Sequence, residues 1–146
     1  MALMRWLLLL GLCVCVGCTK SGAPLNAVTG VVTLDAKPFA EARVMFIPQG
    51  ATLGHGGEGI TNAEGKYEII AHRAESRKGL APGEYKIVIT RVRQPDGSPL
   101  PPGAKTIEIP TKETAPEPYC KPYETPLRAT IGTEAKTFDV SLDAGK

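Results

Sequence analysis

The amino-acid sequence predicts an all-β protein, a seven-stranded antiparallel β-sandwich. Two observations lead to this prediction: apolar and polar residues alternate in short runs from Val28 to Leu142, and turn-forming residues separate the runs. A third is the lack of a convincing amphipathic helix, because Gly79 and Pro82 cut short the one candidate, residues 71–80. Strands with one apolar face each bury those faces by packing as two sheets.

The first two predicted strands are residues 28–34 and 42–47. In both, apolar side chains occur at every second position, which places them on one face of a strand. The first run is also rich in β-branched valine and threonine, which fit a pleated surface well. The polar sequence at 35–38, which ends in proline, is predicted to turn the chain between them.

The third and fourth strands, residues 58–62 and 66–70, are predicted to form a tight hairpin. Its connection begins with Asn62 and ends with Gly65. Glycine adopts a positive φ without steric cost, so we interpret Gly65 as a structural turn residue. Tyr67, just beyond it, is interpreted as a core or edge aromatic residue.

Three further strands complete the predicted set, at residues 85–90, 127–131 and 138–142. Pro82 and Gly83 precede the first of these and are interpreted as structural turn residues. A polar connection containing glycine separates the last two strands, as expected for neighbouring strands of an all-β domain.

Residues 92–126 interrupt this pattern. They hold nine of the thirteen prolines and one short β-like piece, 106–109. Proline cannot donate to a central β-ladder, so the segment should run over the surface or along a sheet edge. Connecting segments often carry binding residues, and we predict partner contact through Tyr119 and Tyr123, with Lys121 as a polar rim. The alternative is an insertion that merely packs along one sheet edge.

Composition argues against several functional classes. Seventeen Lys and Arg residues are interspersed with fifteen Asp and Glu residues, which gives no support to nucleic-acid binding. The only histidines, His55 and His72, lack cysteines or carboxylates at metal-ligand spacing, so neither a metal nor another cofactor is expected. Asp35, Asn62 and Glu64 lack the dense spacing of a calcium loop and are interpreted as turn residues.

The N-terminus has the features of an export signal over residues 1–17. Arg5 provides a positive charge, an apolar stretch follows, and Gly17 is the small residue expected before a cleavage site. The apolar stretch, residues 6–16, is eleven residues long. A membrane span needs about 20 residues, so a transmembrane helix is not expected here.

The sequence Cys15-Val16-Gly17-Cys18 resembles the lipobox of bacterial lipoproteins, although Leu is usual at the first position. The resemblance implies that Cys18 becomes the N-terminus and carries lipid, which anchors the protein to a membrane of the cell envelope. Thr19, rather than Asp, follows it, which favours the outer membrane under the familiar sorting rule. Residues 18–27 would then be a flexible tether, and the domain would face the periplasm or the exterior. The alternative is an ordinary cleaved signal.

Removal of the signal would leave Cys120 as the one unmodified cysteine. A single thiol forms no internal disulfide, so we expect a monomer held together by its apolar core. Cys120 is expected to be half-buried, or else to cross-link two chains in the oxidising envelope.

Three sequence motifs, at residues 28–39, 61–67 and 80–89, resemble the carboxypeptidase regulatory-like domains. These domains have a transthyretin-like (prealbumin-like) β-sandwich related in architecture to the Ig-like fold. The similarity is greatest to small bacterial envelope lipoproteins built from one such domain, and it covers residues 28–142. Ala36 stands where the family usually has glycine, which implies a strained first turn or one of another type.

The resemblance implies a membrane-anchored, non-catalytic envelope lipoprotein whose β-sandwich is a binding or structural module for an envelope protein or a glycan. One alternative is a hydrolase, because some transthyretin-like proteins are hydroxyisourate hydrolases with a C-terminal Tyr-Arg-Gly-Ser tail. Residues 141–146 lack that tail, and no nucleophile elbow is present. A second alternative is a glycan-binding module, but the one tryptophan, Trp6, lies in the signal.

Overall fold

The structure is a computed structural model that describes residues 24–73 and 77–145. The predicted signal, Cys18 and most of the predicted tether lie outside the described residues. Within them every regular element is a β-strand, which confirms the all-β prediction. In chain order the strands are β1 (Val28–Leu34), β2 (Lys37–Pro38), β3 (Arg43–Pro48), β4 (Gly57–Ile60), β5 (Lys66–Glu68), β6 (Ile70–Ala71), β7 (Gly83–Thr90), β8 (Val92–Arg93), β9 (Lys112–Glu113), β10 (Arg128–Ile131), β11 (Lys136–Thr137) and β12 (Val140–Leu142).

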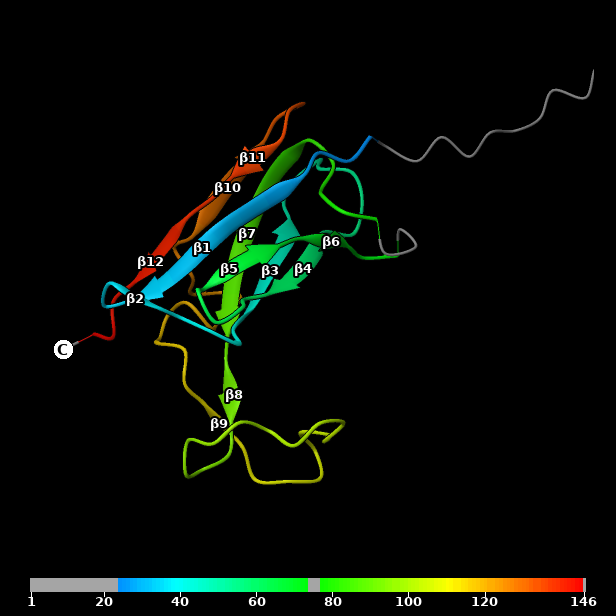
Figure 1. Ribbon diagram of the computed structural model, residues 1–146. Helices are drawn as coiled ribbons and strands as arrows, with labels where there is room; N and C mark the ends of the chain where they lie inside the picture. The colour runs from blue at the N-terminus through cyan, green and yellow to red at the C-terminus, as the bar shows by residue number, and fades with distance from the viewer. Residues whose placement is uncertain (1–23, 74–76, 146) are drawn as a thin grey trace, which may run out of the picture.

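The strands form two five-stranded sheets and one small ladder (Figure 1). The first sheet has the order β10-β7-β3-β4-β6. In the second, β1 lies between β11 and β12 on one side and β2 and β5 on the other. Apolar residues of both sheets form one buried cluster, which includes Val32, Phe46, Tyr67, Ile87 and Leu142. The core therefore lies between the two sheets, as in a sandwich.

The strand pairing differs in two respects from a seven-stranded antiparallel sandwich. The described residues form twelve strands, whereas seven were predicted. Five of the twelve have only two residues each, which is too short for hydrophobic periodicity to reveal. In addition, β11 and β12 run parallel to β1. Parallel neighbours need a long crossover connection, and here almost the whole domain separates β1 from its partners in the sequence.

The predicted hairpin between residues 58–62 and 66–70 is also different. The turn forms, because Gly65 N donates to the carbonyl of Asn62 at 2.9 Å. The returning strand, however, divides at the fully buried Ile69. Before this residue β5 pairs with β1, and after it β6 pairs with β4. The chain thus changes sheets at Ile69, and this makes a corner of the sandwich.

Two predicted turns require a backbone conformation that most residues avoid. Gly65 has a φ of 74°, and a Cβ there would lie 2.4 Å from the carbonyl oxygen of Val32. In the first turn Asp35 and Ala36 have φ values of 48° and 64°. Two successive positive φ values are typical of the type I′ turns that suit β-hairpins. Ala36 adopts this conformation without the advantage of glycine.

Two short segments for which regular structure was considered are irregular in the structure. Residues 106–109, predicted as a short β-like piece, form a turn, and the strand in this part of the chain is β9. The helical candidate at 71–80 is not helical over its described residues. Instead Ala71 N donates to the carbonyl of Arg77 at 2.8 Å, so these two residues of the candidate lie side by side.

Candidate functional site

The proline-rich segment, residues 92–126, lies at the end of the molecule opposite the start of β1 (Figure 1). Its first part, residues 92–113, begins and ends in a two-stranded ladder in which Val92 pairs with Glu113 and Arg93 with Lys112. In Figure 1 this ladder continues the direction of β7 beyond the edge of the core. Because this ladder joins residues 92–93 to residues 112–113, this part of the segment is a structured extension of the sandwich.

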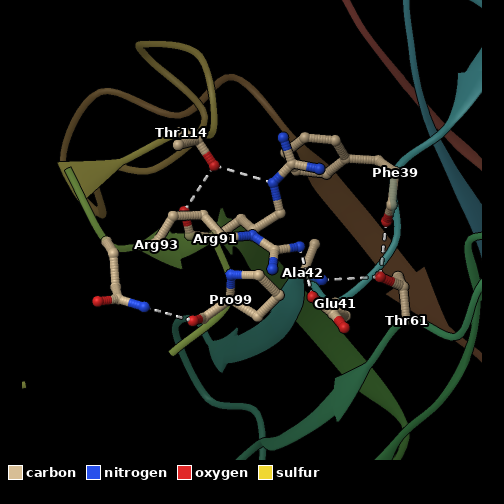
Figure 2. Close-up of polar contacts among 9 residues, drawn as sticks. Phe39, Glu41, Ala42, Thr61, Arg91, Arg93, Pro99 and Thr114 are labelled. Atoms are coloured by element: carbon tan, nitrogen blue, oxygen red, sulfur yellow. Dashed lines mark hydrogen bonds and ion pairs between the residues drawn. The ribbon is translucent and has the colours of Figure 1, made fainter. Parts of the chain in front are cut away.

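Polar side chains around Arg91 hold this extension to the sheet, as Figure 2 shows. The Arg91 guanidinium lies 3.8 Å from the ring centroid of Phe39, which gives a cation–π contact. Arg91 Nε donates to Thr114 Oγ1 at 2.9 Å, and the same hydroxyl donates to the Arg91 carbonyl at 2.8 Å. Burial, together with the nearby charge of Arg93, lowers the pKa of Arg91 from its ordinary value.

The side chain of Glu113 makes three further hydrogen bonds in this region. Its Oε1 accepts from the backbone N–H groups of Arg91, Thr114 and Ala115 at 2.7, 2.9 and 2.7 Å. Arg93, whose side chain is 14% exposed, pairs with Glu41 (Figure 2). We call Arg91, Arg93, Glu41, Glu113 and Thr114 the arginine clasp. A carboxylate that accepts several N–H groups fixes a loop firmly, because charged acceptors make the stronger hydrogen bonds.

The second half of the proline-rich segment lies along β7. Ile89 N donates to the carbonyl of Tyr119 at 3.0 Å, and Thr125 Oγ1 donates to the carbonyl of Ile87 at 2.8 Å. The segment therefore uses backbone groups at the edge of β7 that β10 does not reach. This is the position described by the alternative prediction of a segment packed along a sheet edge.

The predicted contact residues lie in different surroundings. Tyr119 is partly buried and packs against the core, whereas Tyr123 is 97% exposed. Lys121 Nζ lies 3.0 Å from a carboxylate oxygen of Glu117 and 3.3 Å from one of Glu124. The structure thus does not bring the two tyrosines together on one exposed surface, because the chain reverses between them.

Cys120 is half-buried and lies beside Tyr119 at the margin of the core. Burial, with the charge of Glu113 as the next contribution, raises the pKa of its thiol. The neutral thiol is a poor nucleophile. Cys120 therefore has the properties of a packing residue in this conformation.

A second region, not predicted from the sequence, lies near the start of the described chain. A hollow of about 130 Å³ is lined by residues of four separate segments: Leu25, Leu53, Gly54, His55, Gly56, Ala71, His72, Arg73, Arg77, Leu80, Ala81 and Tyr85. We call it the histidine hollow, because it brings together both histidines of the protein. They are far apart in the sequence, and no motif spacing indicates that they are neighbours.

The described lining of the histidine hollow combines basic and apolar side chains. Among the described residues that line it, none is a serine, threonine, cysteine, aspartate or glutamate. The hydroxyl of Tyr85 donates to the carbonyl of Ala81 at 2.8 Å, and burial raises the pKa of this tyrosine. Glu58 lies outside the hollow, with Oε2 3.7 Å from His72 Nε2.

Two general findings hold for the described ranges 24–73 and 77–145. There, no group of three or more histidine, cysteine, aspartate or glutamate residues is placed to hold a metal ion. In the same ranges no helix has the length and apolar character needed to cross a membrane.

No protein-family model matches the chain, and no curated protein sequence matches it. Two solved structures are similar to it. A DUF3823 family protein from Parabacteroides merdae ATCC 43184 is 12% identical with a TM-score of 0.39, over 84% of this chain and 46% of that one. A 9R-lipoxygenase from Cyanothece PCC8801 is 20% identical with a TM-score of 0.38, over 82% of this chain and 16% of that one. This chain thus spans about half the length of the first protein, and similarity at this level carries no argument about activity.

Proposed function

We propose that the protein is a membrane-anchored, non-catalytic lipoprotein of the bacterial cell envelope, and that its β-rich domain is a binding module. The anchor rests on the lipobox-like sequence that ends at Cys18. Two or more acyl chains hold a protein stably at a membrane, whereas one chain is marginal. A tether of nine residues, 19–27, spans at most about 30 Å, which would keep the domain close to the bilayer.

The observation that carries the binding role is the proline-rich segment, which the arginine clasp and β7 hold at the end opposite the start of β1. On a domain anchored through its N-terminus, this end would be directed away from the membrane. A pre-ordered segment loses less conformational entropy on binding than a flexible one. Tyr123 and Lys121 are the residues that we assign to the partner contact. Tyr119 instead packs against the core and so supports the segment.

The membrane anchor is tested by fractionating cells that produce Cys18→Ala. We expect wild-type protein in the membrane fraction with a mass that includes lipid, and the variant either unprocessed or released in soluble form. Cys13→Ala is the matched control, since it removes a cysteine from the same signal and should leave the lipid in place. Normal processing and membrane attachment of Cys18→Ala would contradict the anchor.

The partner contact is tested with Tyr123→Ala in a pull-down from envelope extract. We expect less partner to be recovered, with an unchanged melting temperature, because Tyr123 is almost fully exposed. Ile107→Ala is the matched control: it removes another exposed apolar side chain, 92% exposed, from the same segment. Equal recovery with both variants would show that Tyr123 is not the contact.

A further inference from the structure

The outer edge of the second sheet is formed by residues 136–142, which include β11 and β12. Among the described residues, β1 is the one strand that pairs with either of them. Lys136 N donates to the carbonyl of Ala27 at 2.8 Å. Two residues later, Phe138 N donates to the carbonyl of Thr29, also at 2.8 Å. Every second residue thus directs its N–H group toward β1. We call residues 136–142 the open edge.

The intervening residues of the open edge, Thr137, Asp139 and Ser141, direct their backbone groups away from β1, because successive residues of a strand alternate in direction. All three residues are exposed. Over residues 24–73 and 77–145, the backbone N–H and C=O groups of these three residues make no hydrogen bond. A row of unpaired donors and acceptors with this spacing is a template for another extended polypeptide.

Two features keep the open edge suited to strand pairing. Between β11 and β12 the carbonyl of Phe138 accepts from the hydroxyl of Tyr67 at 2.6 Å. The carboxylate of Asp139 accepts instead from Val31 N at 2.9 Å, which continues the contact with β1 across this break. In addition, residues 136–142 contain no proline, although proline is a common means of blocking an exposed strand. The edge therefore offers N–H donors along its whole length.

The side chains of the open edge indicate what an added strand contains. Val140 and Leu142 are buried, whereas Phe138, whose ring centroid lies 6.2 Å from that of Phe46, is only partly buried. Apolar side chains at every second position of an added strand would cover the rest of the Phe138 ring. A second copy of the chain is disfavoured, because two-fold pairing centred on Asp139 places two carboxylates opposite each other. The ligand is accordingly a different chain with alternating apolar and polar residues.

We propose that the open edge binds an extended segment of a partner protein, which adds to the second sheet as a further strand. The main-chain groups of Thr137, Asp139 and Ser141 supply the hydrogen bonds, and Phe138 supplies an apolar contact. The proposed function assigns the partner contact to Tyr123 and Lys121, which lie in another segment. This proposal therefore goes beyond it and does not depend on membrane attachment.

The test uses the mature protein, labelled with ¹⁵N and titrated with a synthetic peptide while its amide signals are followed by NMR. The peptide repeats the sequence of β1, Val-Thr-Gly-Val-Val-Thr-Leu, with a lysine at each end for solubility, because β1 already pairs with β11 and β12 from the other side. We expect saturable shifts at Thr137 and Ser141, with a Kd on the order of 1 mM. Hydrogen exchange of these two N–H groups should become roughly tenfold slower at saturation.

Two controls separate strand addition from other events. The same peptide with its central Gly-Val replaced by Pro-Pro lacks two N–H donors and should not bind. Absence of saturable shifts with the first peptide, or equal binding of both peptides, would overturn the proposal. Slow exchange of Thr137 and Ser141 that depends on protein concentration, with no peptide added, would identify a second copy as the occupant and would overturn it as well.

Proline variants locate the site. Thr137→Pro and Ser141→Pro each remove an N–H that points away from β1, so the sheet is retained and peptide binding should weaken roughly tenfold. Thr130→Pro is the matched control on β10, the edge of the first sheet. Ile87 N donates to the carbonyl of Leu127, so Thr130, three residues further on, also directs its N–H away from the sheet. This variant should leave the Kd unchanged. Unchanged peptide affinity in both variants of the open edge would contradict the proposal.

Discussion

The sandwich and the proline-rich segment are held in place by different kinds of interaction. The sandwich depends on an apolar core between two sheets, where Phe46, Ile87 and Leu142 are almost completely buried. The proline-rich segment has few such residues and depends on hydrogen bonds and ion pairs, mainly those of the arginine clasp. The stabilising free energy of the sandwich is spread over many buried apolar side chains, whereas that of the proline-rich segment comes from a few polar side chains. The segment should therefore be the easier region to release without unfolding the rest.

The largest effect is expected where the sandwich has no space for an added atom. Gly65→Ala places a Cβ 2.4 Å from the Val32 carbonyl oxygen at a φ of 74°. We expect a loss of roughly 3 kcal/mol in the free energy of unfolding, from the unfavourable φ and from the steric overlap together. Chemical denaturation followed by circular dichroism measures it.

Gly97→Ala is the matched change in the proline-rich segment. Gly97 has a φ of 87°, but nothing lies within 4 Å of an added Cβ. Only the conformational contribution of about 1 kcal/mol should appear. Equal losses at the two positions would show that the Gly65 turn is not tightly packed against β1.

Two buried threonines give the next comparison. In the sandwich, Thr61 Oγ1 accepts from Ala42 N at 2.8 Å and donates to the Phe39 carbonyl at 2.6 Å (Figure 2). Thr61→Val should lower the free energy of unfolding by about 2 kcal/mol, since it leaves two buried backbone groups unpaired. Thr125→Val removes the bond to the Ile87 carbonyl and a long one, of 3.3 Å, that Thr125 Oγ1 accepts from Leu127 N, and it should cost about 1 kcal/mol because the second bond is weak. If Thr125→Val cost as much as Thr61→Val, the edge of β7 would belong to the same cooperative unit as the core.

Glu113→Ala tests whether the arginine clasp restrains the segment locally. It removes the oxygen that three backbone N–H groups share, so local opening should become roughly tenfold more frequent. We expect faster proteolysis within residues 94–112 and little change in the global denaturation midpoint. Glu108→Ala, at an exposed glutamate of the same segment that pairs with the exposed Lys105, should leave the cleavage rate unchanged. A global loss of stability in Glu113→Ala would mean that the two regions unfold together.

The smallest effect is expected at the first turn, and it is stabilising. Ala36 has a φ of 64°, so Ala36→Gly removes left-handed strain and adds flexibility to the unfolded chain. The net gain should be about 0.5 kcal/mol, measurable as a small rise in the denaturation midpoint. Ala63→Gly, in the turn before Gly65 and at a residue without a positive φ, is the control and should instead lower stability slightly.

Local features could be predicted well from the sequence. Alternation of apolar residues located the longer strands, such as β1 and β7, because a strand buries one face and the period of two follows directly. Asn62 and Gly65 indicated their turn because few residues tolerate its backbone angles. The irregular character of residues 92–126 followed from the missing N–H donors of proline.

The candidate sites could be predicted only in part. The sequence assigns Tyr119 and Tyr123 to the proline-rich segment, but their different exposure depends on how that segment runs along β7. The arginine clasp could not be predicted from the sequence. Most of its contacts join residues that are far apart in the chain, and such contacts produce no periodic pattern in a sequence. His55 and His72 gave no signal at all, because their loops meet only through the pairing of β4 with β6.

The sequence by itself determined the all-β class, the positions of the main strands and the turn residues, because these follow from interactions between neighbours in the chain. The tertiary structure alone decided the parallel pairing of β1 with β11 and β12, the change of sheets at Ile69 and the assembly of the histidine hollow. These features join residues far apart in the chain. Their partners are chosen when two sheets bury a common core, and that choice depends on the packing of the whole domain.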